Sequence, residues 1–167
     1  METGAAAEIV TIEMVRKYLD RLSAAVMARD FDTFADMYAL PFVIHSRLHR
    51  YERGTREELR RSFDLWQRTI EVNQVTEVVL RPRRIETFGH DMLIVDYDAD
   101  LLNGAQKMLP TFGNVVLLRR CEGVWRMEQA MTGTENGPAS LFLRVDAKNP
   151  QPQAESYILD GKRPKKT

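Results

Sequence analysis

Three aspartates, Asp96, Asp98 and Asp100, occupy every second position of one segment and alternate with apolar or aromatic residues. In a β-strand this period of two places all three carboxylates on the same face. Such a row suits either a metal or acid–base site, or an outer face paired with the arginines of residues 81–84. The consistently apolar alternate positions favour the second interpretation. A regular strand also lacks the glycine turns and backbone oxygens that Asp-rich metal loops use.

Two histidines, His45 and His49, have the spacing of a zinc-binding pair. That spacing brings two imidazoles to one metal when both lie on a helix. Here the surrounding residues favour a strand followed by a hairpin, and no third ligand is evident. We therefore expect no metal site and no cofactor.

The elements that position these residues begin with helices. Apolar residues recur every three or four positions from Ile12 to Val26, which predicts a long amphipathic helix. Asp30 can cap a second, short helix, and Pro41 is expected to end it. A brief apolar strand at residues 42–44 follows, and then a polar hairpin or edge strand at residues 46–53. Thr55 and Glu58 then have the spacing of a capping box, which predicts the start of a third helix.

From residue 73 onward the hydrophobic period changes to two. The pattern predicts strands at residues 75–85, 91–102, 108–121 and 124–132, separated by turns at 89–90, 103–104 and 122–123. Their short connections make them antiparallel neighbours. Helices first and a long meander after them predict an α+β domain in which one sheet curls around the helices.

The composition limits the cellular compartment and the classes of binding partner that suit this chain. Lys plus Arg and Asp plus Glu each number 24, so no overall field favours a nucleic acid. Cys121 is the only cysteine, which excludes an intramolecular disulfide and fits a reducing compartment. The first residues have no signal-peptide pattern, and no window approaches the roughly 18 apolar residues of a membrane span. We expect a cytoplasmic protein that binds neither nucleic acid nor membrane.

The order of elements, together with the segments FDTFADMY, RGTREELRRSF and GVWRM, resembles the nuclear-transport-factor-2-like superfamily, and within it the small bacterial SnoaL-like proteins. The resemblance covers residues 8–133. It implies a cone-shaped α+β barrel, with three helices from the N-terminal half packed in the concave face of a strongly bent, mixed or antiparallel sheet. It also implies an enclosed pocket and a homodimer formed through the convex face of the sheet.

Residues 134–167 lie outside the resemblance and form a proline-containing C-terminal arm, either disordered or part of an interface. The apolar residues Leu141, Phe142 and Leu143 are candidates for docking on the same subunit or on a partner. The basic residues near the end of the chain suit a solvated terminus.

Comparison with the isomerases of this superfamily places Ser46 where those enzymes carry an aspartate base, which a serine cannot replace unaided. Residues 105–121 contain no Asp or Glu, so that strand cannot supply the protonated acid of an isomerase oxyanion hole. Strand parity predicts that Trp125, Met127, Gln129 and Met131 point inward. The candidate residues for a ligand pocket are Ser46, Phe63, Trp66, Tyr97 and Gln129. For Tyr97 and Gln129 a role as core residues satisfied by backbone groups is an equally good interpretation.

Two functions remain open from the sequence. The first is an apolar pocket for a small apolar or amphipathic organic molecule, with or without proton-transfer catalysis of the dehydratase, cyclase or isomerase type. The second is a non-catalytic module for dimerisation or protein interaction. The sequence leaves open whether the protein is an enzyme.

Overall fold

The computed structural model describes residues 10–133, and its three helices begin at the capping residues Thr11, Asp30 and Thr55. The sequence predicts the caps at Asp30 and Thr55 but not the one at Thr11. The expected C-terminal arm, with Leu141, Phe142 and Leu143, lies outside the described residues. Helix α1 spans Ile12–Met27, α2 spans Phe31–Asp36 and α3 spans Arg56–Val72. The Thr55 hydroxyl accepts a hydrogen bond from the Glu58 amide at 3.1 Å, and the Glu58 carboxylate accepts one from the Thr55 amide at 3.3 Å. This capping box satisfies amides at the start of α3 that have no partner within the helix.

Seven strands form one mixed sheet in the described part of the chain. Their bounds are β1 Tyr38–His45, β2 Arg50–Arg53, β3 Glu77–Phe88, β4 Met92–Asn103, β5 Gln106–Lys107, β6 Phe112–Cys121 and β7 Val124–Thr132. The spatial order is β2-β1-β7-β6-β4-β3, with β5 paired to β4. All neighbours are antiparallel except β1 and β7, which run parallel because the long meander returns beside the first strand.

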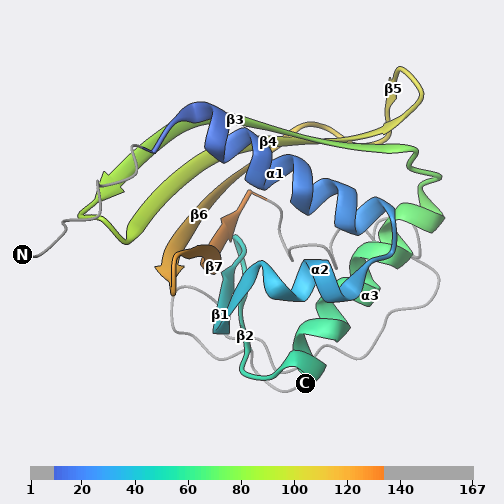
Figure 1. Cartoon of the computed structure of the whole chain (residues 1–167). Helices are drawn as coiled ribbons and strands as arrows, with labels where there is room; N and C mark the ends of the chain where they lie inside the picture. Colours follow the sequence, from blue (N-terminus) through green and yellow to red (C-terminus); the bar gives the residue numbers. More distant parts are fainter. Residues whose placement is uncertain (1–9, 134–167) are drawn as a thin grey trace, which may run out of the picture.

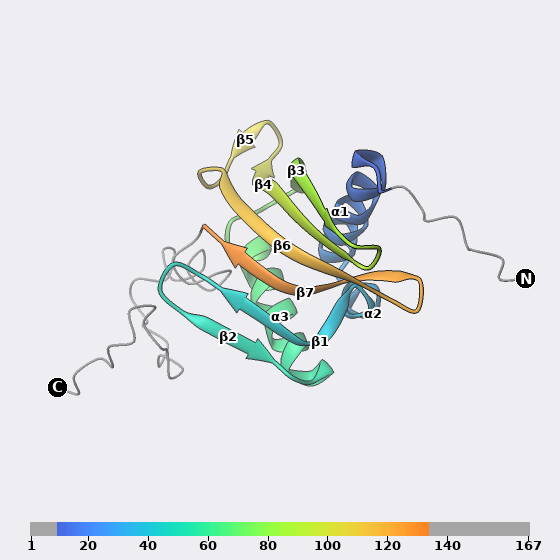
Figure 2. The same ribbon diagram turned by 90° about the vertical axis from the view of Figure 1, so that its left-hand side faces the viewer.

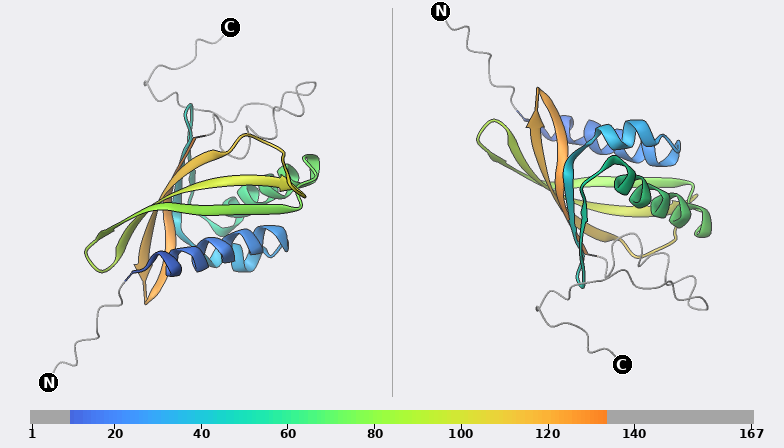
Figure 3. Two further views of the ribbon diagram at one scale, coloured as in Figure 1. Left: turned by 90° about the horizontal axis from the view of Figure 1, so that it is seen from above. Right: turned by 90° about the horizontal axis from the view of Figure 1, so that it is seen from below.

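All three helices lie on the concave side of the strongly bent sheet (Figures 1 and 3). Helix α1 packs along β3, while α2 and α3 close the other part of the concavity. In Figure 2 the described helices lie behind the sheet, so its convex face carries no described helix. The sheet is bent but not closed, and the arrangement is the expected α+β cone.

One boundary differs from the sequence-based expectation. The second helix ends at Asp36, and Pro41 lies inside β1 rather than at the end of a helix. The pairing of β1 with β7 is irregular there, since it passes from Tyr38 opposite Met127 directly to Val43 opposite Gln129. Proline lacks an amide hydrogen, and this interruption in the ladder is where a strand tolerates it.

The pleat of β4 separates charge from core as the alternation predicts. Val95, Ala99 and Leu101 are almost fully buried on the concave side. On the other face the Arg83 guanidinium lies 2.7 Å from a carboxylate oxygen of Asp96 and 3.4 Å from one of Asp98. Across residues 10–133, no cluster of three or more His, Cys, Asp or Glu side chains is arranged to hold a metal ion.

Asp100 differs from the other two aspartates because only 2% of it is exposed. Arg81 and Lys107 lie 2.5 and 3.2 Å from its carboxylate oxygens, and the Thr111 hydroxyl donates a hydrogen bond to it. Burial alone raises the pKa of Asp100, but the hydrogen bonds from Thr111, Arg81 and Lys107 outweigh it and hold the pKa below its ordinary value. The carboxylate therefore ties the β5 turn to the sheet.

We expect Asp100→Asn to lower the free energy of unfolding by about 1–3 kcal/mol near neutral pH, because the variant loses the charge that its buried partners require. A carboxylate with a depressed pKa in the folded state stabilises above its unfolded pKa of about 3.9 and loses that contribution as the pH falls through the folded value. The difference between the two proteins should therefore shrink below about pH 4 in urea unfolding experiments. Asp98→Asn, at a more exposed ion pair, is the control and should cost less than about 1 kcal/mol. A difference that does not change with acid would contradict this role.

Candidate functional site

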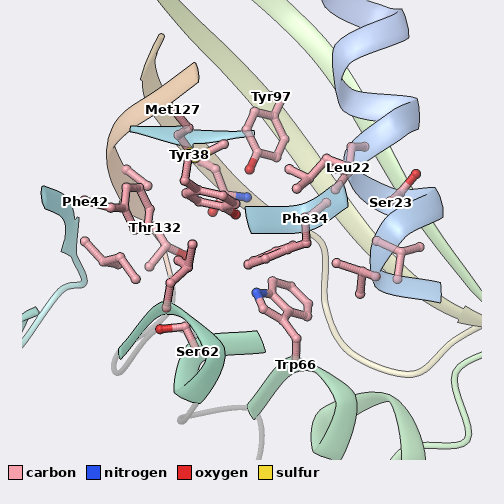
Figure 4. Close-up of a pocket in the computed structure, with 18 of the residues that line it drawn as sticks. Leu22, Ser23, Phe34, Tyr38, Phe42, Ser62, Trp66, Tyr97, Met127 and Thr132 are labelled. Carbon is pink, nitrogen blue, oxygen red and sulfur yellow. The ribbon is translucent and has the colours of Figure 1, made fainter. Parts of the chain in front are cut away.

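A largely apolar cavity lies between the concave face of the sheet and helices α1, α2 and α3 (Figure 4). Its volume is about 90 Å³, measured as the space open to the centre of a water-sized sphere. One water molecule needs roughly 10–15 Å³ on that measure, so the cavity has room for a small organic molecule. The apolar wall includes Leu22, Val26, Phe34, Phe42, Leu59 and Met127.

Polar side chains reach this cavity from both of its walls. On the sheet side they belong to Tyr38, Tyr97, Asn114 and Thr132. On the helix side α1 adds Ser23, and α3 adds Ser62 and the indole of Trp66. None of the described residues that line the cavity is an aspartate, glutamate, histidine, lysine, arginine or cysteine. The cavity thus offers neutral hydrogen-bonding groups and no ionised side chain.

Three of these polar residues are direct cross-strand neighbours. Tyr97 of β4 is opposite Asn114 of β6, and Asn114 is in turn opposite Thr132 of β7. Side chains directly opposite each other on one face of a sheet have Cβ atoms about 4.5–5.5 Å apart. The three side chains therefore form a continuous polar row across the sheet wall, which we call the Tyr97–Asn114–Thr132 row.

Burial keeps the tyrosines of this region protonated. Loss of hydration raises the pKa values of Tyr97 and Tyr38 well above the ordinary value near 10, and the neighbouring phenols raise that of Tyr38 further. Burial also raises the pKa of Tyr18, whose hydroxyl donates a 2.8 Å hydrogen bond to the Met37 carbonyl. Tyr18 is thus engaged with the backbone, whereas Tyr38 and Tyr97 line the cavity.

Of the five residues that the sequence predicts for a pocket, two line the cavity and three do not. Trp66 and Tyr97 line the cavity, and Figure 4 shows both side chains directed toward it. Phe63 lies behind the lining, where its ring packs 5.5 Å from Phe31 and 4.9 Å from Phe34 between ring centroids. Phe63 is therefore a core residue that supports the wall.

Ser46 belongs to the turn between β1 and β2. Its hydroxyl accepts a 3.0 Å hydrogen bond from the His49 amide and donates one of 3.2 Å to the His49 carbonyl. It is buried and does not line the cavity. Ser46 thus stabilises the turn through hydrogen bonds to the His49 backbone.

Gln129 is exposed and points away from the cavity, contrary to the parity predicted for the last strand. The cause is a β-bulge: Leu117 is opposite Gln129 while Leu118 is opposite Met127, which leaves Glu128 as an extra residue in β7. Beyond the bulge the inward positions are Ala130 and Thr132. Met127 is buried as expected, and Met131 is 55% exposed.

Sequence reasoning missed Tyr38, Ser62, Asn114 and Thr132. For Asn114 a signal was present, since it is a lone amide in an otherwise apolar strand at an inward position set by its register with Tyr97. Thr132 carried no such signal, because the bulge determines which way it faces.

A bent sheet and three helices enclosing a cavity of this kind define a small α+β domain of the cone type. The chain belongs to the SnoaL-like family, because the family model described as a SnoaL-like domain matches residues 15–132. No curated protein matches the chain in sequence.

Solved structures of low sequence identity share this fold. An NTF2-like protein of unknown function from Shewanella oneidensis has 14% identity and a TM-score of 0.55, and the match covers 71% of this chain and 95% of that one. A protein named as a candidate dehydratase of the NTF2-like family from Streptomyces avermitilis has 14% identity and a TM-score of 0.55, with 74% and 94% covered. A candidate calcium/calmodulin-dependent protein kinase II association domain from Xanthomonas campestris has 17% identity and a TM-score of 0.57, with 78% and 92% covered. At such identities the likeness extends to the fold alone.

We expect Tyr18, Tyr38 and Tyr97 to ionise only well above pH 10, with the unfolded chain in urea as the control. A raised folded pKa means that the stabilisation is complete below the unfolded value of about 10 and is lost as the pH rises toward the folded value. Phenolate absorbance and thermal unfolding, measured together against pH, check this. Tyr97→Phe should lose less stability in alkali than the wild type. Ordinary tyrosine titration in the folded protein would contradict the burial of these phenols.

Proposed function

We propose that the protein binds a small, uncharged and largely apolar organic molecule in the cavity, and that it does so without using a cavity residue as a base. The observation that carries this proposal is the absence of any ionisable acid, imidazole or amine among the described lining residues. A charged ligand entering such a cavity would lose its hydration without gaining a counter-charge. A neutral ligand loses much less hydration free energy on entering the cavity.

The same lining argues against proton abstraction. A general base works best with a pKa near the working pH, which carboxylates and histidines in apolar pockets achieve. The ionisable groups at this cavity are Tyr38 and Tyr97, whose pKa values lie far above neutral because of burial. At neutral pH both are hydroxyl groups that donate or accept hydrogen bonds. This supports binding over the dehydratase, cyclase or isomerase reactions of similar folds.

Binding of isopropylbenzene tests the cavity itself. We expect this uncharged probe to bind the wild type and to change the fluorescence of Trp66 in a Trp125→Phe background, where Trp66 is the sole tryptophan. Ala130→Leu places a larger side chain in the cavity and should lower the affinity at least about tenfold, because the ligand and the new side chain compete for the same space.

The matched control is Ala24→Leu, which adds the same group to the exposed side of α1. It should leave isopropylbenzene binding unchanged. No binding to the wild type, or an equal loss in both variants, would overturn the proposal of a ligand cavity.

We also propose that the convex face of the sheet forms a homodimer. Met131 is 55% exposed near the C-terminal end of β7, and its cross-strand neighbour Val115 is only partly buried. Leu117 is partly exposed two residues further along the same strand. Exposed apolar side chains gathered on an uncovered sheet face favour association. None of the described helices is long and apolar enough to cross a membrane.

Met131→Lys should shift the protein to the monomer in sedimentation velocity experiments, because a cation would then be buried without a partner in the proposed interface. Phe88→Lys is the control, since Phe88 is 44% exposed but lies at the far end of β3. A wild type that sediments as a monomer, or a dimer indifferent to Met131→Lys, would contradict the convex-face dimer.

A further inference from the structure

The most unusual groups in the cavity are the side chains of Tyr97 and Asn114. They are 7% and 8% exposed, so each is more than nine-tenths buried. Both line the cavity, and they lie opposite each other on β4 and β6. No side-chain hydrogen bond joins the Tyr97 hydroxyl or the Asn114 amide to another residue in the described part of the chain.

Buried polar groups in proteins are normally hydrogen-bonded, and each one left without a partner costs about 1–3 kcal/mol. Elsewhere Ser62 accepts a 2.8 Å hydrogen bond from Arg53, and the buried Asn73 amide donates one of 2.9 Å to the Thr69 carbonyl. Among the described residues, the one fully buried side-chain atom without a hydrogen-bond partner is His49 Nδ1, which does not line the cavity. Tyr97 and Asn114 instead border the cavity, so a molecule inside it can supply their hydrogen bonds.

We propose that Tyr97 and Asn114, two members of the Tyr97–Asn114–Thr132 row, recognise an uncharged carboxamide group of the bound molecule. This inference rests on the proposed binding function, which it deepens by naming the chemical class of the ligand. The apolar body of that ligand would lie against Phe34, Phe42 and Trp66 on the opposite parts of the wall.

The hydrogen-bond donors and acceptors of Asn114 and Tyr97 favour a carboxamide over other neutral groups. The Asn114 side chain carries a donor, its NH₂ group, and an acceptor, its carbonyl oxygen. A ligand group that pairs with both must therefore present an acceptor and a donor side by side. A carboxamide provides both: its carbonyl accepts from the Asn114 NH₂ and its NH donates to the Asn114 carbonyl. A second lone pair of the ligand carbonyl can accept from the Tyr97 hydroxyl. A ketone leaves the Asn114 carbonyl without a donor, and a hydrocarbon leaves all of these groups unpaired.

A carboxylate in the same position is disfavoured by the absence of cations. Arg53 is the arginine that contacts a lining residue, through its hydrogen bond to Ser62, and its own side chain does not line the cavity. Burial lowers the pKa of Arg53, because its guanidinium is partly removed from water. An anion beside the row would therefore find no counter-charge among the described residues that line the cavity.

Three probes of nearly equal shape separate these possibilities: isopropylbenzene, acetophenone and benzamide. They share the aromatic ring and differ in whether the branch carries no polar group, a carbonyl, or a carbonyl and an NH₂. Dissociation constants for all three are measured by calorimetry with the wild type, Asn114→Leu and Tyr97→Phe. The change caused by each variant is compared within one probe, so the different hydration of the free probes cancels.

We expect Asn114→Leu to weaken benzamide about tenfold or more and acetophenone by a smaller factor, while isopropylbenzene binds at least as well as before. Tyr97→Phe keeps the ring, removes only the hydroxyl, and should weaken benzamide and acetophenone but not isopropylbenzene. Gln129→Leu is the matched control, because it removes the same amide from an exposed position outside the cavity. It should leave all three dissociation constants unchanged.

The two levels of the proposal fail in different ways. If isopropylbenzene does not bind the wild type, the cavity function itself is overturned. If isopropylbenzene binds but benzamide does not, or if benzamide is indifferent to both Asn114→Leu and Tyr97→Phe, the cavity stands and its specificity for carboxamides is overturned. Equal weakening of benzamide and acetophenone by Asn114→Leu would likewise contradict the carboxamide, since the variant would then have removed only a carbonyl contact.

Discussion

The two-sided pleat of β4 is the constraint on which the rest of the structure depends. Its concave face buries Val95, Ala99 and Leu101 beside the helices, and its convex face carries aspartates that pair with arginines of β3. A shift of one residue in register would exchange these faces and bury charge, so the register is strongly specified. That register places Tyr97 at the cavity and opposite Asn114. Near the end of the same strand Asp100 holds the β5 turn against the sheet.

The fold supplies an enclosed space, and the lining residues decide what that space can do. Enzymes that abstract protons in such a space need a carboxylate or histidine whose pKa burial has moved toward neutrality. Here burial acts instead on tyrosines and moves their pKa values further from neutrality. The Ser46 hydroxyl is hydrogen-bonded within a turn, and the Tyr18 hydroxyl donates a hydrogen bond to a backbone carbonyl. The chemistry left at the wall is neutral hydrogen bonding, which suits recognition of a ligand.

Sequence reasoning was successful where local signals and tertiary structure agree. The alternation in β4, the capping box at Thr55 and the order of elements are all found as predicted. It failed at Gln129, because one extra residue at Glu128 reverses the parity of β7 and periodicity gives no sign of it. It misplaced Pro41, because a gap in strand pairing accommodates a residue that otherwise ends an element. Asn114 carried a sequence signal as a lone amide, but only its register with Tyr97 and Thr132 places it at the cavity. The cavity wall was thus predictable, and most of its polar groups were not.

As proposed above, the Asn114 amide and the Tyr97 hydroxyl form the recognition end of an otherwise apolar binding cavity. A crystal structure of the protein soaked with benzamide tests this most directly. We expect one molecule in the cavity, with its ring near Trp66 and its carboxamide within hydrogen-bond distance of Asn114 and Tyr97. Benzamide bound with its carboxamide directed away from these residues, or a cavity filled by side chains that leave no space for it, would contradict this recognition role.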